Sequence, residues 1–355
     1  MGPIDAFIEK LPKAELHVHV EGTLEPELAL ELAERNGVRL PWSSAEELRA
    51  AYRFRDLESF LDLYYAATQV LVRQRDFYDL TWAYLKRIST QAVLHAELFF
   101  DPQAHTRRGV PFARVVTGIH EALLAGKREL GVDSSLILCF LRDRSVEEAQ
   151  ATLEQALRHR DRIVGVGLDS SERGHPPARF RDVFARARSE GLRAVAHAGE
   201  EGPASYVWEA LEALRAERID HGIRSLEDEA LVRHLAERRV PLTVCPLSNV
   251  KLGLVEDLKA HPLREMLERG LVVTVNSDDP AYFGGYLNEN YRAVERALGL
   301  DRDQLVRIAG DSFRASFLDA SEKTALLARL DAYAAGACAM PGREPRPMWT
   351  KSEGR

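Results

Sequence analysis

The stretch Val195-Ala196-His197-Ala198-Gly199-Glu200 is a short apolar run that ends in a histidine and turns through a glycine to a glutamate. An apolar run of this length before a turn residue is typical of a buried parallel strand. In a barrel of parallel strands, the carboxyl ends of the strands carry the active site. His197 and Glu200 are therefore candidate site residues. A hydrogen-bonded core histidine and a carboxylate in the first turn of a helix would give the same pattern.

The same alternation of short apolar runs with amphipathic stretches continues along the chain. We expect eight strands, at Glu15–Val20, His95–Phe100, Ser135–Leu141, Ile163–Asp169, Ala194–Ala198, Arg218–His221, Leu242–Pro246 and Val272–Asp278. Apolar residues at helical spacing predict helices between them, among others after Asp56, from Pro26, over Arg181–Glu190 and over Leu226–Arg238. This order predicts an α/β fold, a single-domain (β/α)8 TIM barrel with extra helices. A doubly wound open sheet is the alternative, although no G-x-G-x-x-G motif follows the first strand.

Length and composition fit one large domain. The chain has 355 residues, of which 45% are hydrophobic. The formal charge of −7 predicts no nucleic-acid partner, and no apolar run reaches the length of a membrane span. Three scattered cysteines (Cys139, Cys245 and Cys338) and an N-terminus unlike a signal peptide predict a cytoplasmic setting. We expect the domain to cover residues 1–339, and residues 340–355, rich in Pro, Arg and Lys, to form a loose tail. The sequence carries no signal for an oligomeric state.

Four side chains at predicted strand ends form a candidate metal site. His17 and His19 lie on one face of the first strand, because alternate residues of a strand point the same way. His197 ends the fifth strand, and Asp278 ends the eighth, followed directly by Asp279. Two adjacent acids at a strand end are costly unless a positive charge lies nearby. Three imidazoles and one carboxylate, with a position left for water or substrate, are typical of catalytic zinc, although iron, cobalt or manganese would be accommodated.

His221 ends the sixth strand and so faces the same end of the barrel. Each of these features alone has a structural explanation: a chance H-x-H pair, a core histidine, or an Asx turn before Pro280. Their coincidence at the ends of four strands favours one metal centre. The fourth strand ends in Gly167–Ser171, without a lysine that could bridge a second metal, so we expect one zinc ion per chain.

Histidines on strands one, five and six with an aspartate on strand eight resemble the amidohydrolase superfamily. Four short motifs narrow the resemblance to the adenosine and adenine deaminase family: His197-Ala-Gly-Glu200, Asp220-His221-Gly222, Cys245-Pro-Leu-Ser-Asn249 and Asn276-Ser-Asp-Asp-Pro280. The resemblance covers residues 11–335. The signature of the cytidine-deaminase type, H-x-E with P-C-x-x-C, is absent.

The resemblance implies a role for each matching residue. The zinc ligands would be His17, His19, His197 and Asp278. Glu200 would donate a proton to purine N1, His221 would orient and help to deprotonate the attacking water, and Asp279 would hydrogen-bond purine N7. These residue types suit the chemistry, since zinc lowers the pKa of its bound water to about 7. A carboxylic acid with a raised pKa neutralises the charge that develops at N1. Both His221 and Asp278 are candidates for the base.

Two departures from the adenosine deaminase pattern indicate free adenine as the substrate. Glu21 stands where adenosine deaminases have a shorter aspartate facing the ribose, and residues 169–177 replace their Leu-Ala-Gly-Asp-Glu segment. Both departures resemble the bacterial and fungal adenine deaminases, as do Phe77–Trp82 and Phe99–Gln103. We hypothesise that the longer acid and the altered loop fill the space of a ribose. We therefore expect deamination of adenine to hypoxanthine and ammonia in purine salvage, with four substrate-binding candidates: Glu21, Ser170, Ser171 and Glu172.

Three other functions are consistent with parts of the sequence. The first is deamination of adenosine or of an N6-substituted adenine, which a comparison of free base with nucleoside would detect. The second is a zinc-binding barrel without catalysis, which Glu200 and His221 disfavour because zinc binding needs neither. The third is an amide-bond or phosphoester hydrolase, which the missing bridging lysine disfavours.

Overall fold

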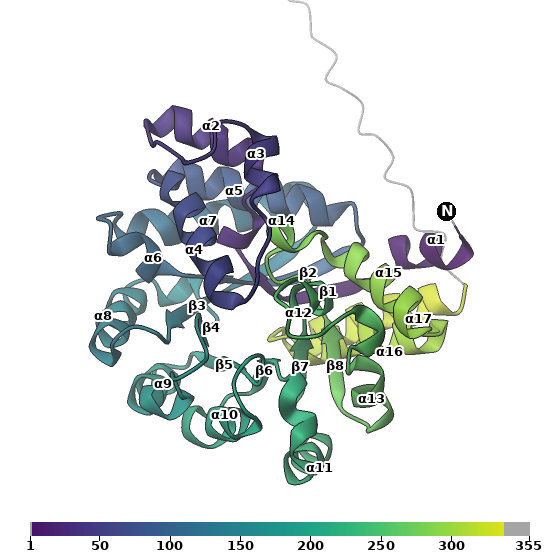
Figure 1. Ribbon diagram of the computed structural model, residues 1–355. Coiled ribbons are helices and arrows are strands. Elements are labelled where there is room, and N and C mark those ends of the chain that lie inside the picture. The colour runs from purple at the N-terminus through teal and green to yellow at the C-terminus, as the bar shows by residue number, and fades with distance from the viewer. Residues whose placement is uncertain (1, 337–355) are drawn as a thin grey trace, which may run out of the picture.

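The protein, seen here as a computed structural model, is described over residues 2–336, so the predicted tail at 340–355 and the domain boundary at 339 lie outside the described residues. Eight parallel strands form one sheet in sequence order. Figure 1 shows them at the centre of the molecule with helices around them. The strands are β1 (Lys13–His19), β2 (Val93–Phe100), β3 (Asp133–Leu141), β4 (Gly165–Asp169), β5 (Arg193–Ala198), β6 (Arg218–His221), β7 (Pro241–Val244) and β8 (Val272–Val275).

The barrel closes between β1 and β8, and metal-ligand candidates stand on both sides of this seam. Val18 forms a parallel bridge with Asp278. The His19 backbone N–H donates to the carbonyl of Asp278 at 3.0 Å, and the Asp278 N–H donates to the carbonyl of His17 at 3.1 Å. Closure confirms the predicted (β/α)8 barrel over the open doubly wound sheet.

The α-helices surround the strands, and further helices extend the barrel at its N- and C-terminal segments. They are α1 (Pro3–Lys10), α2 (Pro26–Asn36), α3 (Ala45–Ala50), α4 (Leu57–Ala67), α5 (Gln74–Ser89), α6 (Pro102–Thr106), α7 (Phe112–Ala125), α8 (Val146–Leu157), α9 (Arg181–Ser189), α10 (Ala204–Glu209), α11 (Glu229–Arg238), α12 (Pro246–Lys251), α13 (Leu263–Glu268), α14 (Pro280–Phe283), α15 (Leu287–Leu298), α16 (Arg302–Ala315) and α17 (Ala320–Ala334). Short helical turns are η1 (Glu21–Thr23), η2 (Thr68–Val70), η3 (Gly126–Leu130), η4 (Arg160–Arg162), η5 (Pro177–Phe180), η6 (Ala210–Leu214), η7 (Ile223–Glu227) and η8 (Leu258–Ala260).

Local caps explain where two of the predicted helices begin. Asp56 is the predicted N-cap of α4, and its side chain accepts the Ser59 backbone N–H at 2.9 Å. The helix predicted from Leu226 begins only at Glu229, because Asp228 caps α11 through two backbone N–H groups. Glu200 lies before α10, which begins at Ala204, so it is not a first-turn carboxylate of that helix.

Buried charges lie at the amino ends of the strands. Lys13 donates to the carbonyls of Leu11 at 2.9 Å and Gln91 at 2.8 Å. Arg218 pairs with Glu97 at 2.6 Å, both fully buried. These charged side chains are paired with carbonyl or carboxylate groups of the core, and the opposite end of the barrel is left for a site.

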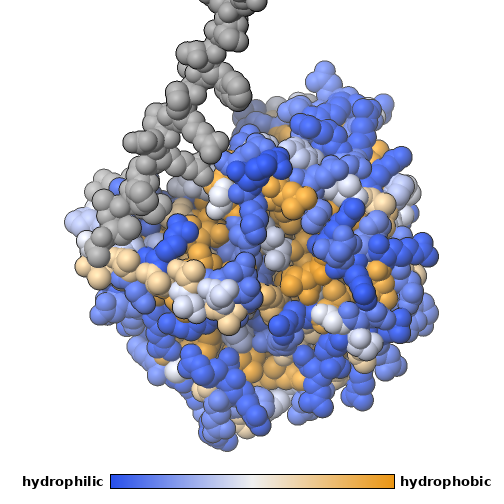
Figure 2. Space-filling view, turned by 180° about the vertical axis from the view of Figure 1, so that it is seen from behind, coloured by the Kyte–Doolittle hydropathy of each residue, from blue (hydrophilic) through white to orange (hydrophobic). Residues whose placement is uncertain are grey.

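On the face seen in Figure 2, hydrophilic side chains break up the hydrophobic areas. Among residues 2–336, Leu124 is the large hydrophobic residue that stands exposed. Within the same residues no helix combines the length and apolar character needed to cross a bilayer.

Candidate active site

A pocket lies at the carboxyl ends of the strands and has two unlike sides. The apolar side comes mostly from α4, with Leu57, Phe60, Leu61, Tyr64, Tyr65, Leu252 and Phe283. The polar side consists of His19, Asp101, Asp169, Ser170, His197, Glu200, His221, Asp278 and Asp279. A flat apolar wall facing convergent polar groups suits a small planar heterocycle.

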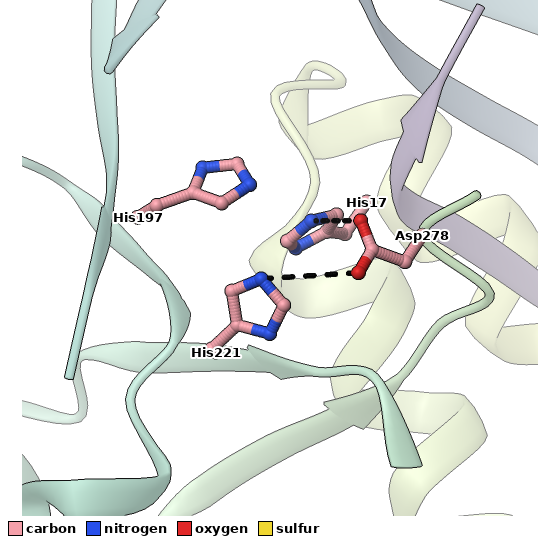
Figure 3. Close-up of side chains that lie close together, drawn as sticks. All are labelled: His17, His197, His221 and Asp278. Carbon is pink, nitrogen blue, oxygen red and sulfur yellow. Dashed lines mark hydrogen bonds and ion pairs between the residues drawn. The ribbon is translucent and has the colours of Figure 1, made fainter. Parts of the chain in front are cut away.

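Three histidines and an aspartate from four strand ends converge beneath this pocket. One donor atom of each of His17, His197, His221 and Asp278 lies within 4.8 Å of the others, all in buried side chains. Figure 3 shows the three rings grouped around the Asp278 carboxylate. Nε2 of His17 lies 3.1 Å from Oδ1 of Asp278.

His19 completes the predicted ligand set on the other side of Asp278. Its Nε2 lies 3.3 Å from Nε2 of His197 and 3.5 Å from Oδ1 of Asp278. A tetrahedral zinc ion with ligand bonds of about 2.0–2.1 Å separates its donors by about 3.3–3.4 Å. The donor set and its spacing therefore fit zinc.

Polar groups behind the histidines turn their Nε2 atoms toward this centre. Nδ1 of His17 lies 3.0 Å from the Thr243 hydroxyl, which donates to Asp220 at 2.7 Å. The other Asp220 oxygen lies 3.7 Å from Nδ1 of His197. A hydrogen-bond partner such as the Thr243 hydroxyl fixes the tautomer of a ligand histidine. Asp220 belongs to the motif Asp220-His221-Gly222, and its place behind the histidines is visible only in the fold.

Burial keeps two of these imidazoles neutral, which is the form that binds a metal. Burial lowers the pKa of His19 to about 4. It also lowers the pKa of His197 well below its usual value, helped by the neighbouring histidines. Neutral rings with inward lone pairs are ready to accept a cation.

Glu200 and His221 form an acid and base pair beside the centre. Nε2 of His221 lies 3.6 Å from Oε2 of Glu200 and 4.0 Å from Oδ2 of Asp278. Burial first, and then the Asp278 carboxylate, raises the pKa of Glu200 well above its usual value. Burial lowers the pKa of His221 to about 3. Glu200 can therefore donate a proton while neutral His221 can accept one.

Two residues of the site have strained backbones. His221 and Asp278 both have φ of 65°, in the left-handed region that favours glycine. His221 is the last residue of β6, and Asp278 lies three residues beyond the end of β8; both side chains line the pocket.

A family model of adenosine deaminases matches residues 12–333. The chain belongs to the adenosine deaminase family. It is 57% identical over 320 residues to an adenine deaminase of Crocosphaera subtropica, covering 90% of this chain and 98% of that protein. It is 59% identical over 324 residues to an adenine deaminase of Cupriavidus necator, covering 91% and 92%.

Solved structures agree with this membership. An adenine deaminase from Arthrobacter aurescens has a TM-score of 0.90 at 51% identity, covering 91% of this chain and 99% of that one. An amidohydrolase from Burkhoderia ambifaria, solved with bound Zn, has a TM-score of 0.86 at 27% identity, covering 94% of each chain. Both neighbours support the barrel, and the first of them is a deaminase.

Glu172 was predicted to contact the substrate, but its side chain points into a loop and not into the pocket. Its carboxylate accepts the backbone N–H groups of Gly199, Glu200, Glu201 and Gly202, at 2.7, 3.0, 2.8 and 2.7 Å. It does not line the pocket. Glu172 therefore positions the loop that carries Glu200.

Glu21, predicted to face the substrate, is fully buried beside the pocket and does not line it. Its Oε1 accepts from Nε2 of His105 at 2.7 Å and from the Asp101 backbone N–H at 3.2 Å. Arg108 lies 2.7 Å from the other ring nitrogen of His105, which leaves Nε2 as the donor. Glu21 thus supports the wall of the pocket from behind.

The two predicted serines differ in position. Ser170 lines the pocket and its hydroxyl lies 3.4 Å from that of Tyr65. Ser171 lines a second cavity outside the pocket, which also contains Ser170 and Tyr65. Of the two, only Ser170 reaches the pocket.

Asp279 lines the pocket, and its Oδ1 has no hydrogen-bond partner within residues 2–336. Burial, followed by the Asp278 carboxylate, raises the pKa of Asp279 well above its usual value. A Cβ at Gly22 would lie 1.9 Å from this oxygen, so only glycine fits there. Asp279 is therefore placed to hydrogen-bond a ligand. The structure also adds Asp101 and Asp169, which the sequence analysis had not assigned to the pocket.

Proposed function

We propose that this chain removes the 6-amino group of adenine by hydrolysis, giving hypoxanthine and ammonia, with one zinc ion per chain. Relatives named adenine deaminase at 56–59% identity support a hydrolytic deaminase. The observation that carries the proposal is the buried Glu200 carboxyl, 3.6 Å from His221 and beside the histidine–aspartate centre. A metal-binding protein without catalysis would need no such acid.

The residues that would hold zinc are His17, His19, His197 and Asp278, because their donor spacing fits it and burial keeps His19 and His197 neutral. When bound, zinc supplies a water molecule acidic enough to form hydroxide near pH 7. His221 would then contact the metal's water and not the metal, since it faces Glu200.

The pocket residues can orient the purine through its nitrogen atoms. The ring would lie against the apolar side formed by α4, with its reacting edge toward Glu200. Asp279, held protonated by its raised pKa, would donate to N7. These two contacts would fix the ring in its plane and turn C6 toward the residues that would hold the metal.

Glu200 and His221 divide the proton transfers between them. Glu200 gives its proton to N1 as attack at C6 pushes electrons onto that atom. His221, kept neutral by burial, takes the proton of the attacking water and passes it to the leaving amine. A neutral acid and a neutral base near pH 7 make both transfers possible.

The test is turnover by zinc-loaded protein of adenine and, separately, of adenosine, followed by absorbance and ammonia release. We expect fast conversion of adenine and little action on adenosine. Preference for adenosine or an N6-substituted adenine would keep the mechanism and contradict the substrate. No turnover of any of them, with zinc bound, would favour the non-catalytic barrel. The salvage role and the cytoplasmic setting stay predictions.

A further inference from the structure

Two neighbouring carboxyl groups of the pocket wall have few donors within residues 2–336, the nearest ring nitrogen being Nδ1 of His19, 3.6 Å from Oδ2 of Asp169. Asp101 and Asp169 are 3% and 2% exposed and both line the pocket. Oδ1 of Asp101 lacks a hydrogen-bond partner in the same part of the chain. One carboxylate oxygen of each aspartate lies within 4.8 Å of a ring nitrogen of His19 and of the other aspartate's oxygen. Buried acceptors without donors cost free energy, so such groups commonly await a ligand.

The chain holds Asp101 in place. Asp101 follows β2 directly and precedes Pro102, the first residue of α6. Its backbone N–H donates to Glu21, which His105 holds from the other side. Asp169 is the last residue of β4. The backbone positions of both residues are therefore fixed before any ligand binds.

The orientation of the purine leaves one polar edge for this wall. With N1 at Glu200 and N7 at Asp279, the remaining polar atoms of adenine are N3 and N9. In the free base N9 carries a hydrogen, and in a nucleoside N9 carries the sugar carbon. An N–H donor is what Oδ1 of Asp101 lacks within the described residues. Burial, and after it the Asp169 carboxylate, raises the pKa of Asp101, whose carboxyl hydrogen-bonds that of Asp169. Oδ1 of Asp101 is still left as an acceptor without a donor within residues 2–336.

We propose that Asp101 accepts the N9–H of the free purine base, with Asp169 beside it, and thereby distinguishes base from nucleoside. This inference rests on the proposed function. A nucleoside would leave Oδ1 of Asp101 unpaired and press its ribose against the two carboxyl groups. Glu21 then acts on specificity through the Asp101 backbone, as a positioning residue.

The test compares adenine with 9-methyladenine, which lacks the N9 hydrogen, in wild type, Asp101→Ala and Asp101→Asn. Asp62→Asn is the matched control, because Asp62 is an exposed aspartate of the outer cavity. Wild type and Asp62→Asn should strongly prefer adenine. In Asp101→Ala we expect kcat/KM for adenine to fall about 10- to 100-fold, with no fall for 9-methyladenine. Asp101→Asn, whose amide oxygen still accepts, should keep part of the preference.

Calorimetric binding of hypoxanthine and 9-methylhypoxanthine gives a readout without turnover. Asp101→Ala should weaken hypoxanthine binding alone, at unchanged metal content. Equal losses for both compounds would overturn the inference, as would full adenine activity with a gain for 9-methyladenine, since Asp101 would then only exclude bulk. Equal wild-type activity on both bases would also overturn it and leave the proposed function intact. The proposed function itself fails only if the wild type does not deaminate adenine.

Discussion

The backbone N–H of Glu200 donates to the carboxylate of Glu172 at 3.0 Å, so one buried acid fixes the loop that carries another. The three neighbouring N–H groups of the same loop donate to it as well. Four donors around one carboxylate make a strong and rigid contact. The position of Glu200 is thus fixed by hydrogen bonds of its own backbone and of its neighbours.

Replacing Glu172 by Gln should damage both stability and rate, because an amide group would face N–H donors with its own NH2. We expect the free energy of unfolding to fall by about 2–4 kcal/mol. The fall in kcat should exceed any rise in KM. Denaturant unfolding and steady-state kinetics measure these effects. Glu201→Gln is the control, since the Glu201 side chain does not bind this loop; equal effects in both variants would contradict the assignment.

Replacing Glu200 by Gln should remove the proton donor and little else. We expect kcat for adenine to fall about 10²–10⁴-fold, which is the usual size of general acid catalysis. Zinc content and melting temperature should stay near those of wild type, because no ligand candidate is changed. Residual activity near the wild-type level would exclude Glu200 as the acid.

Acid should destabilise the protein through Glu97. Burial alone would raise the pKa of Glu97, but Arg218 and His95 outweigh it and hold the pKa at about 2. Because this pKa lies below the ordinary value of 4.5, the stabilisation is present above about pH 4.5 and is lost as the pH falls toward 2. We expect about 2 of about 3 kcal/mol to be lost at pH 3. Urea unfolding at pH 7 and pH 3 measures the loss, and Glu97→Gln should show a smaller one.

Removing the metal should lower the melting temperature, because an ion that binds only the folded state stabilises it. Without zinc, the three candidate histidine ligands and Asp278 no longer share a bound cation. We expect one zinc ion per chain, restored stability on adding zinc back, and a weaker zinc response in His19→Ala. His120→Ala, at a half-buried histidine of α7, should respond as wild type does. A melting temperature insensitive to chelation would argue against the site.

The sequence predicted the strands because buried parallel strands are apolar on both faces. It extended β7 and β8 too far, since β8 ends at Val275 and not at Asp278. A run of apolar and β-branched residues does not show at which residue the strand stops hydrogen-bonding to its neighbour. The left-handed φ of Asp278 has only a weak signature in residue type, since aspartate is merely enriched in that region.

The sequence also predicted which residues gather at the site, but not where every side chain points. Strand alternation and strand ends brought together the four ligand candidates. Glu172 and Glu21 were expected to contact the substrate. Their carboxylates instead accept hydrogen bonds from backbone N–H groups of the protein. No role for Asp101 could be predicted from the sequence, because only the fold shows that its carboxyl lies beside that of Asp169.

The left-handed backbones of His221 and Asp278 have a practical consequence for engineering. Each conformation costs about 1–2 kcal/mol relative to an ordinary one. A screen that selects only for heat resistance would therefore favour glycine or asparagine at both positions. Such variants would gain melting temperature and lose catalytic activity. Thermostable versions of this protein should be sought elsewhere on the barrel, with positions 221 and 278 held constant.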